Sequence, residues 1–171
     1  MATVTVTPDQ NTIVAEIFIA APPERVFHAI TDPRQMPQWW GQKDMYRITE
    51  WTADLRPGGK WSSVGESIDG KAFRVDGEYL EVDPPRLLVH TWIASWSPDL
   101  ETVVRWHLEP RDVHNLQHRG PRRAGTGTFV TVHHDGFAKG PQAALEHAKG
   151  WSRVLAWMQA YVEEGKTVDM R

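Results

Sequence analysis

The sequence contains no cysteine among its 171 residues. This absence excludes disulfide bonds, a thiol nucleophile, a thiolate zinc site and a cysteine-ligated iron–sulfur cluster. The sequence also lacks an 18-residue apolar run and a charged-then-apolar segment at its start, so we expect no membrane insertion and a cytoplasmic location. Its net charge of −3 gives no global basic field, and we therefore expect no nucleic-acid partner.

Several catalytic and cofactor motifs are also missing. There is no Gly-x-Ser-x-Gly elbow, no complete Gly-x-x-x-x-Gly-Lys-Ser/Thr phosphate-binding loop and no dinucleotide fingerprint. We therefore expect no cofactor and assign no catalytic residue, and the sequence favours a binding protein over an enzyme.

Two histidine patterns are weak candidates for a metal site. His114 and His118 are four residues apart, which suits two ligands on a helix, but the glycine and proline that follow indicate a loop. His133 and His134 are neighbours in a predicted strand, where adjacent side chains point to opposite faces. We therefore predict no metal site.

Tryptophan is the residue in excess, with nine against three tyrosines and five phenylalanines. The remaining composition, 40% hydrophobic and 24% charged, is ordinary for a globular protein. An excess of indole rings indicates bulky aromatic walls in the fold.

The order of hydrophobic patterns predicts an α+β protein. A first strand over 12–20 is followed by a helix that begins at the 21–24 segment, Ala-Pro-Pro-Glu, and by a second short helix from about Arg34 to Gly41. The longest helical pattern covers 141–164 and ends at Gly165. Between the helices, strands are predicted over 46–54, 59–66, 71–82, 86–96, 101–109 and 126–134.

The connections between these strands are short, which predicts an antiparallel meander. A curved antiparallel sheet of six or seven strands has to cover one face, and helix 141–164 is long enough to lie across it. We predict one domain over 1–171 with its core at about 12–164. The 111–124 stretch, with four arginines and two histidines, is predicted to be a long hairpin loop without an assigned role.

Five ordered motifs carry a resemblance to a known family: Ala-Pro-Pro-Glu-Arg-Val-Phe at 21–27, Trp-Trp-Gly at 39–41, Pro-Gly-Gly-Lys-Trp at 57–61, the 77–87 segment from Gly77 to Leu87, and Gly-Trp at 150–151. The chain resembles the START-related (SRPBCC), birch-pollen-allergen-like helix-grip superfamily, in the branch of activator of heat-shock-protein-90 ATPase homologue-like proteins.

The resemblance implies a curved sheet around the C-terminal helix, with an apolar cavity between them. It does not imply one activity, because the superfamily includes lipid and hormone carriers, polyketide cyclases and co-chaperones. The eukaryotic co-chaperone of this branch has an additional N-terminal domain, for which these residues leave no room. This counts against contact with a chaperone.

We predict that a small hydrophobic or amphipathic molecule, such as a lipid, binds in this cavity. His90 and Trp92 share one face of their strand by the period of two, which makes His90 the candidate polar anchor. Phe27 and Met158 are predicted at the lip or floor. The complete predicted lining is Phe27, Trp40, Trp61, Tyr79, His90, Trp92, Trp106, Trp151, Leu155 and Met158.

Three alternatives stay open at this point. The aromatic residues could simply fill a solid core. A cyclase- or hydrolase-like enzyme could use the same cavity, with His90, Arg105, Glu78 or Tyr79 moving protons. A chaperone-associated interaction module could present helix 141–164 and the Trp39-Trp40 pair to a partner, in which case indole rings would be exposed.

Overall fold

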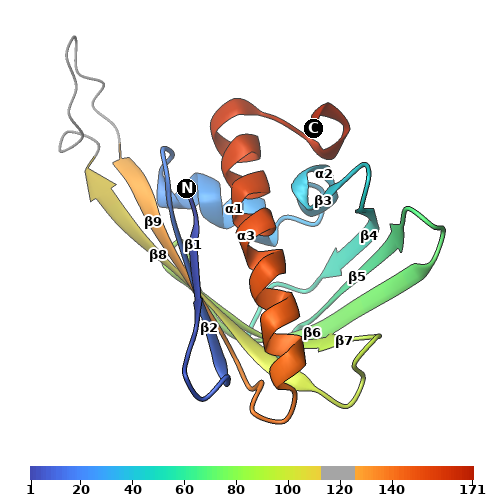
Figure 1. Cartoon of the computed structure of the whole chain (residues 1–171). Helices are drawn as coiled ribbons and strands as arrows, with labels where there is room; N and C mark the ends of the chain where they lie inside the picture. Colours follow the sequence, from blue (N-terminus) through green and yellow to red (C-terminus); the bar gives the residue numbers. More distant parts are fainter. Residues whose placement is uncertain (113–125) are drawn as a thin grey trace.

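The computed structural model describes residues 1–112 and 126–171 of the chain. Within these residues, nine strands form one antiparallel sheet with a long helix against it (Figure 1). The strand order is β1-β2-β9-β8-β7-β6-β5-β4-β3. The strands are β1 (Thr3–Val6), β2 (Thr12–Ile19), β3 (Gly41–Gln42), β4 (Tyr46–Ala53), β5 (Lys60–Ser67), β6 (Ala72–Asp83), β7 (Leu87–Ala94), β8 (Glu101–Asp112) and β9 (Thr126–Asp135).

The α-helices in the described part of the chain are α1 (Pro23–Thr31), α2 (Met36–Trp39) and α3 (Pro141–Glu164). Helix α1 begins with Pro23 in its first turn and Glu24 beside the positive end of the helix dipole. Helix α3 ends at Gly165, whose φ of 69° is in the left-handed region that favours glycine. The predicted α+β helix-grip fold is confirmed.

The number of strands is a correction, because the described residues form nine strands where six or seven were predicted. Strand β1 is formed by the alternating threonines and valines at 3–6, and it pairs with β2 at the edge of the sheet. Strand β3 has two residues, and its pairing of Gly41 with Arg47 on β4 defines it. Such a short strand leaves no period-two pattern in the sequence.

The predicted 111–124 loop is only partly described. Strand β8 continues to Asp112, beyond its predicted end at 109, whereas strand β9 begins at Thr126 as predicted. His114 and His118 lie outside the described residues.

Helix α3 contacts β1 and β2 at one end of the strand order. Strands β4, β5 and β6 lie toward the other end of the strand order, where the sheet curves away from β1 and β2 (Figure 1). The helix buries one stripe of apolar side chains: Ala144, Trp151, Val154, Leu155, Trp157, Met158 and Tyr161. Because α3 follows one side of the sheet, the space between it and the far strands has to be filled by long side chains or remain open.

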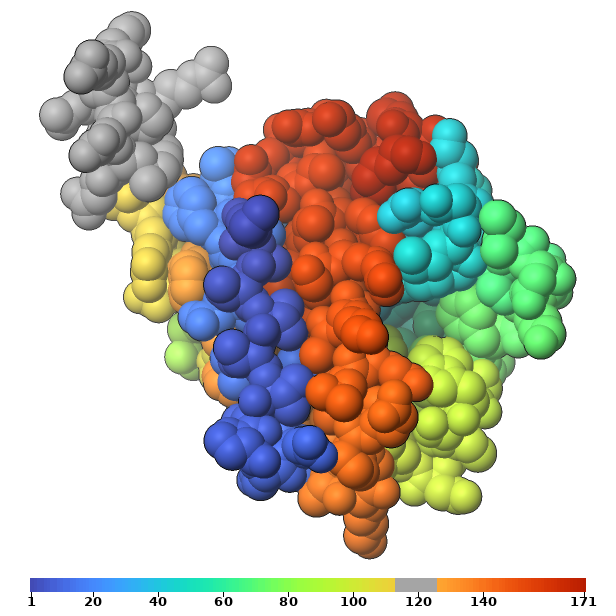
Figure 2. Space-filling model, viewed as in Figure 1, coloured from blue at the N-terminus to red at the C-terminus, as the bar shows by residue number. Residues whose placement is uncertain are grey.

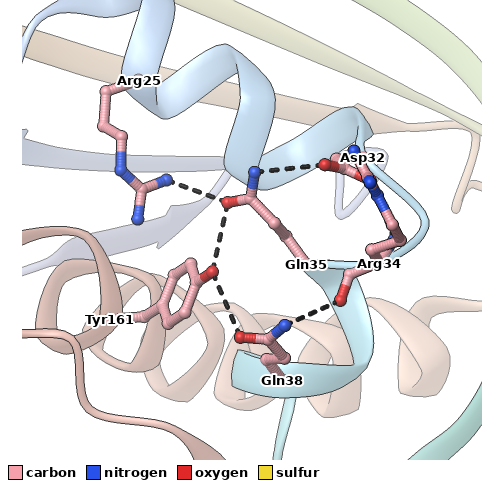
Figure 3. Close-up of polar contacts among 6 residues, drawn as sticks. All are labelled: Arg25, Asp32, Arg34, Gln35, Gln38 and Tyr161. Carbon is pink, nitrogen blue, oxygen red and sulfur yellow. Dashed lines mark hydrogen bonds and ion pairs between the residues drawn. The ribbon is translucent and has the colours of Figure 1, made fainter.

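A polar network joins α1, α2 and the C-terminal half of α3 (Figure 3). The side-chain oxygen of Gln35 accepts hydrogen bonds from Arg25 at 2.9 Å and from the Tyr161 hydroxyl at 3.2 Å. The Gln35 amide donates to Asp32 at 3.3 Å. The Arg25 guanidinium also lies 5.0 Å from the centroid of the Tyr161 ring. This network fixes both short helices over one end of α3.

The residues after α3 pack against the fold. Val168, in a 3-10 helix (Val168–Met170), is 2% exposed. Arg171 donates to the backbone oxygens of Trp39 at 2.6 Å and Gly41 at 2.7 Å. Among the described helices, none has the length and apolar character needed to cross a membrane.

Candidate functional site

A cavity of about 320 Å³ lies between α3 and strands β4 to β7. In Figure 2 it corresponds to the recess between α3, in orange, and the green to yellow-green strands. Five tryptophans line the cavity: Trp40, Trp51, Trp92, Trp96 and Trp151. Tyr46 and Phe73 add two further aromatic rings. Helix α3 adds Glu146, His147, Gly150 and Val154. Trp96 is half exposed and Glu146 is exposed, so these two residues mark the opening.

Trp40 is the centre of the aromatic cluster. Its ring centroid lies 6.1 Å from Trp51, 6.2 Å from Trp92 and 6.2 Å from Trp151. The interplanar angles of these pairs are 40°, 27° and 65°. Trp40 also donates a hydrogen bond from Nε1 to the Tyr46 hydroxyl at 3.1 Å. Trp40, the C-cap residue of α2, therefore connects strands on one side of the cavity with α3 on the other.

A second, much smaller space of about 10 Å³ adjoins the cavity, and we call it the inner space. It shares Trp40, Trp51, Trp92 and Trp151 with the cavity. A volume of this size is close to the smallest that holds one water molecule. The inner space is therefore packed core, whereas the volume of the cavity is in the range of a small organic molecule.

The structure separates the ten predicted lining residues into three groups. Trp40, Trp92 and Trp151 line the cavity. Trp61, Tyr79, His90 and Trp106 line the inner space. Phe27, Leu155 and Met158 are buried in the core and line neither. A ligand-binding role for any of the ten stays a prediction.

Trp51 was missed by the sequence reasoning, and a β-bulge explains why. The register of β4 against β5 shifts between Ile48 and Glu50. Tyr46 and Ile48 face inward by simple alternation, which would point Trp51 outward. The extra residue at the bulge reverses the alternation, so that Trp51 lines the cavity.

The buried His90 holds Trp106 in place. Its Nδ1 lies 3.0 Å from the backbone oxygen of Thr91, and its Nε2 lies 3.3 Å from Nε1 of Trp106. An indole nitrogen only donates, so Nε2 accepts and the proton is on Nδ1. Burial lowers the pKa of His90 to about 4, so the ring is neutral at pH 7. Both ring nitrogens of the predicted polar anchor are thus already paired.

His134 forms a matching pair with Trp151. Trp151 donates from Nε1 to Nδ1 of His134 at 3.0 Å, which puts the histidine proton on Nε2. That nitrogen lies 2.7 Å from the Thr102 hydroxyl, which donates in turn to the backbone oxygen of Trp92 at 3.3 Å. Burial, with the nearby His147 and His90, lowers the pKa of His134 well below its usual value. This chain of hydrogen bonds orients a tryptophan of the cavity wall.

His147 has one ring nitrogen to spare. Its Nδ1 donates to the backbone oxygen of Ala143 at 2.8 Å, while the buried Nε2 has no hydrogen-bond partner among the described residues. The indole nitrogens of Trp51 and Trp92 are likewise buried and unpaired within the described part of the chain. Burial is the main cause that lowers the pKa of His147. The residues lining the cavity therefore carry two unpaired donors and one unpaired acceptor.

The residues of the enzyme alternative are dispersed. Glu78 accepts from Lys60 at 2.6 Å and Arg105 donates to Asp135 at 2.8 Å, and neither lines the cavity or the inner space. Tyr79 lines the inner space, where burial raises its pKa to about 12. No group of three or more metal-ligating side chains occurs in residues 1–112 and 126–171.

The surface required by the interaction alternative is not formed at the Trp39-Trp40 pair. Trp39 is fully buried and donates from Nε1 to the Ala29 backbone oxygen at 2.8 Å, and Trp40 is 8% exposed. Trp96, at the cavity opening, is the tryptophan with a large exposed fraction, 52%.

Several solved structures share this fold. A protein from Rhodobacter sphaeroides is 20% identical with a TM-score of 0.72, and the match covers 95% of this chain and 99% of that one. Protein Ms6760 from Mycobacterium smegmatis is 23% identical with a TM-score of 0.72, over 94% of this chain and 96% of that one. DynU16, from the dynemicin biosynthetic locus, is 22% identical with a TM-score of 0.64, over 92% of this chain and 49% of that one.

A search of curated protein sequences finds no match. The profile of the Activator of Hsp90 ATPase homolog 1-like protein family matches residues 20–116, which is more than half of the chain and contains four of the five sequence motifs. Together with the helix-grip fold, this match shows that the chain belongs to that family.

Proposed function

We propose that the protein binds a small, largely apolar molecule that contains a ring system, in the cavity between α3 and strands β4 to β7. The observation that carries the proposal is a cavity of about 320 Å³ whose lining combines five tryptophans with unpaired polar nitrogens. Its volume is at the lower end of the range found for ligand pockets, about 300 to 1,000 Å³.

The unpaired nitrogens support this proposal because buried polar groups in native proteins nearly always have hydrogen-bond partners. Leaving one unpaired costs about 1–3 kcal/mol. A molecule with a hydrogen-bond acceptor for Trp51 or Trp92, and a donor for Nε2 of His147, would remove part of this cost on binding.

Gly150, a residue of helix α3, also supports the proposal that a molecule binds in the cavity. It lies in the interior of α3 and lines the cavity, and a Cβ atom placed on it would meet nothing within 4 Å. Glycine in a helix interior is less stable than alanine by about 0.5–1 kcal/mol. Glycine at this position therefore weakens the helix, but it also leaves the cavity free of a side chain.

The test is a titration of fatty acids, sterols, flavonoids and aromatic polyketides, followed by tryptophan emission and thermal unfolding. A ligand of the native state quenches emission saturably and raises Tm by mass action. The variant Gly150→Leu fills part of the cavity and should abolish both responses. Lys149→Leu is the matched control, because Lys149 is exposed on the same helix and does not line the cavity.

The proposal fails if no compound in the panel binds the unmodified protein. It also fails if Gly150→Leu, folded by circular dichroism, binds as tightly as the Lys149→Leu control. The second outcome would move the binding site away from the cavity.

A cyclase- or hydrolase-like reaction in the same cavity is the second candidate function. DynU16, which shares the fold, comes from a biosynthetic locus, and Nε2 of His147 is an unpaired acceptor that could take a proton from a bound molecule. Turnover of a bound compound that is lost in His147→Phe, with binding retained, would establish catalysis. Binding of panel compounds without any chemical change would exclude it for those compounds.

A further inference from the structure

The fixed charge in the cavity lining is negative. Glu146 is the ionisable carboxylate in the lining, and within residues 1–112 and 126–171 no lysine or arginine lines the cavity. Arg153 is close enough to act electrostatically on Tyr46, but it is exposed and does not line the cavity. A bound anion would therefore lie near a carboxylate with no cation in contact, and desolvating an unpaired anion is costly.

The aromatic lining also favours positive charge. Indole, phenol and phenyl faces carry negative potential, which attracts cations within about 6 Å of the ring centroid, and tryptophan is the strongest of these rings. The rings around Trp40 lie at 27°, 40° and 65° to it, so their faces point in several directions. A cationic group in the cavity would therefore lie among several aromatic rings.

His147 adds an acceptor next to Glu146 on α3. Its Nδ1 is used as a donor to Ala143, which leaves Nε2 as a lone-pair acceptor. A protonated amine donates hydrogen bonds and accepts none, so it matches this nitrogen. The unpaired indole N–H groups of Trp51 and Trp92 instead match an acceptor, such as an ether or carbonyl oxygen, elsewhere on the same molecule.

We propose that the ligand of this cavity is an organic cation, a ring system that carries a protonated amine, with its charge near Glu146 and His147. The inference rests on the proposed function, because it assigns the charge of the molecule bound in that same cavity.

Three probes with the same three-ring body and different charge test it: aminomethylanthracene as the cation, hydroxymethylanthracene as the neutral compound and anthracenecarboxylate as the anion. Affinities are measured at neutral pH by calorimetry and by quenching of tryptophan emission. We expect the cation to bind about tenfold more tightly than the neutral probe, and the neutral probe to bind more tightly than the anion.

The source of the preference is tested by Glu146→Gln. This exposed residue can change without removing buried contacts, and the affinity for the cation should fall about two- to fivefold, while that for the neutral probe should change much less. Glu164→Gln is the matched control, with the same charge change at the far end of α3, and should alter neither affinity. Added salt should weaken cation binding in the unmodified protein and much less in Glu146→Gln.

The inference is overturned, with the proposed function intact, if the neutral probe or the anion binds as tightly as the cation. It is also overturned if Glu146→Gln lowers the affinities for cation and neutral probe equally. If none of the three probes binds, both the inference and a cavity for ring systems of this size are refuted.

Discussion

The two halves of helix α3 face the same curved sheet but bury their side chains differently. In the C-terminal half, Leu155 and Met158 are fully buried, and α1 and α2 fill the space between helix and sheet. In the N-terminal half, His147 and Gly150 face the cavity. Trp40, which directly follows α2, lines the cavity. The interior is therefore hollow where the fold has no further helix to place against β4 to β6.

The largest difference between the two regions should appear on removing a tryptophan from each. Trp39→Ala deletes a fully buried ring and its hydrogen bond to Ala29, so we expect a loss of about 3–5 kcal/mol in the free energy of unfolding. Trp96→Ala removes a half-exposed ring at the cavity opening and should cost less than about 1 kcal/mol. Denaturant unfolding monitored by circular dichroism measures both.

If Trp39→Ala does not fold, Trp39→Phe provides the same comparison at lower cost, with Trp96→Phe as its partner. Equal losses at the two positions would contradict the contrast between a solid and a hollow end.

Acid should weaken the side of the core where the two buried histidines hold their tryptophans. The folded-state pKa of His90 is about 4, below the usual 6.5, so between these values the unfolded chain binds a proton that the folded chain does not. The contribution of His90 to the free energy of unfolding is therefore fully present above pH 6.5. It falls by about 3 kcal/mol as the pH is lowered toward 4. His134 acts in the same direction.

The measurement is the free energy of unfolding as a function of pH for the unmodified protein and His90→Gln. The variant should show a shallower fall between pH 6.5 and 4, whatever its stability at neutral pH. An unchanged slope in His90→Gln would show that its imidazole does not stay neutral in the folded protein.

Sequence patterns predicted most of the fold because its elements are long and periodic. Helix α3 carries an apolar stripe and a glycine stop, and its bounds were predicted correctly. The cavity lining was harder to predict, because it depends on register. The bulge in β4 that turns Trp51 inward leaves no mark in the local sequence, since it is set by the pairing with β5.

Knowing that a side chain points inward also does not show whether it lines the cavity or the inner space. Trp61 and Trp92 both face the interior and their ring centroids are 5.7 Å apart, yet Trp92 lines the cavity and Trp61 does not. The distinction depends on how closely α2 and α3 approach each strand. That distance results from tertiary packing, which the spacing of residues along one chain does not encode.

Replacing a glycine beside the inner space with alanine should destabilise the protein. Gly77 lies opposite Trp61, and a Cβ there would be 2.1 Å from the Thr91 backbone oxygen and 2.2 Å from Nε1 of Trp61. Because the first of these atoms is backbone, the clash cannot be relieved by rotating a side chain. We expect Gly77→Ala to lower the free energy of unfolding by about 1–3 kcal/mol. A neutral result in denaturant unfolding would mean that β6 and β7 separate more easily than this packing implies.

The same substitution on the hollow side should have the opposite sign. A Cβ on Gly150 meets nothing within 4 Å, and alanine is the better helix former, so Gly150→Ala should raise the free energy of unfolding by about 0.5–1 kcal/mol. Because the two variants carry the same chemical change, measuring them side by side by thermal and denaturant unfolding isolates the effect of the surroundings. A loss of stability in Gly150→Ala would mean that this part of α3 lies closer to the sheet than a cavity of ligand size allows, which would remove the basis of the binding proposal.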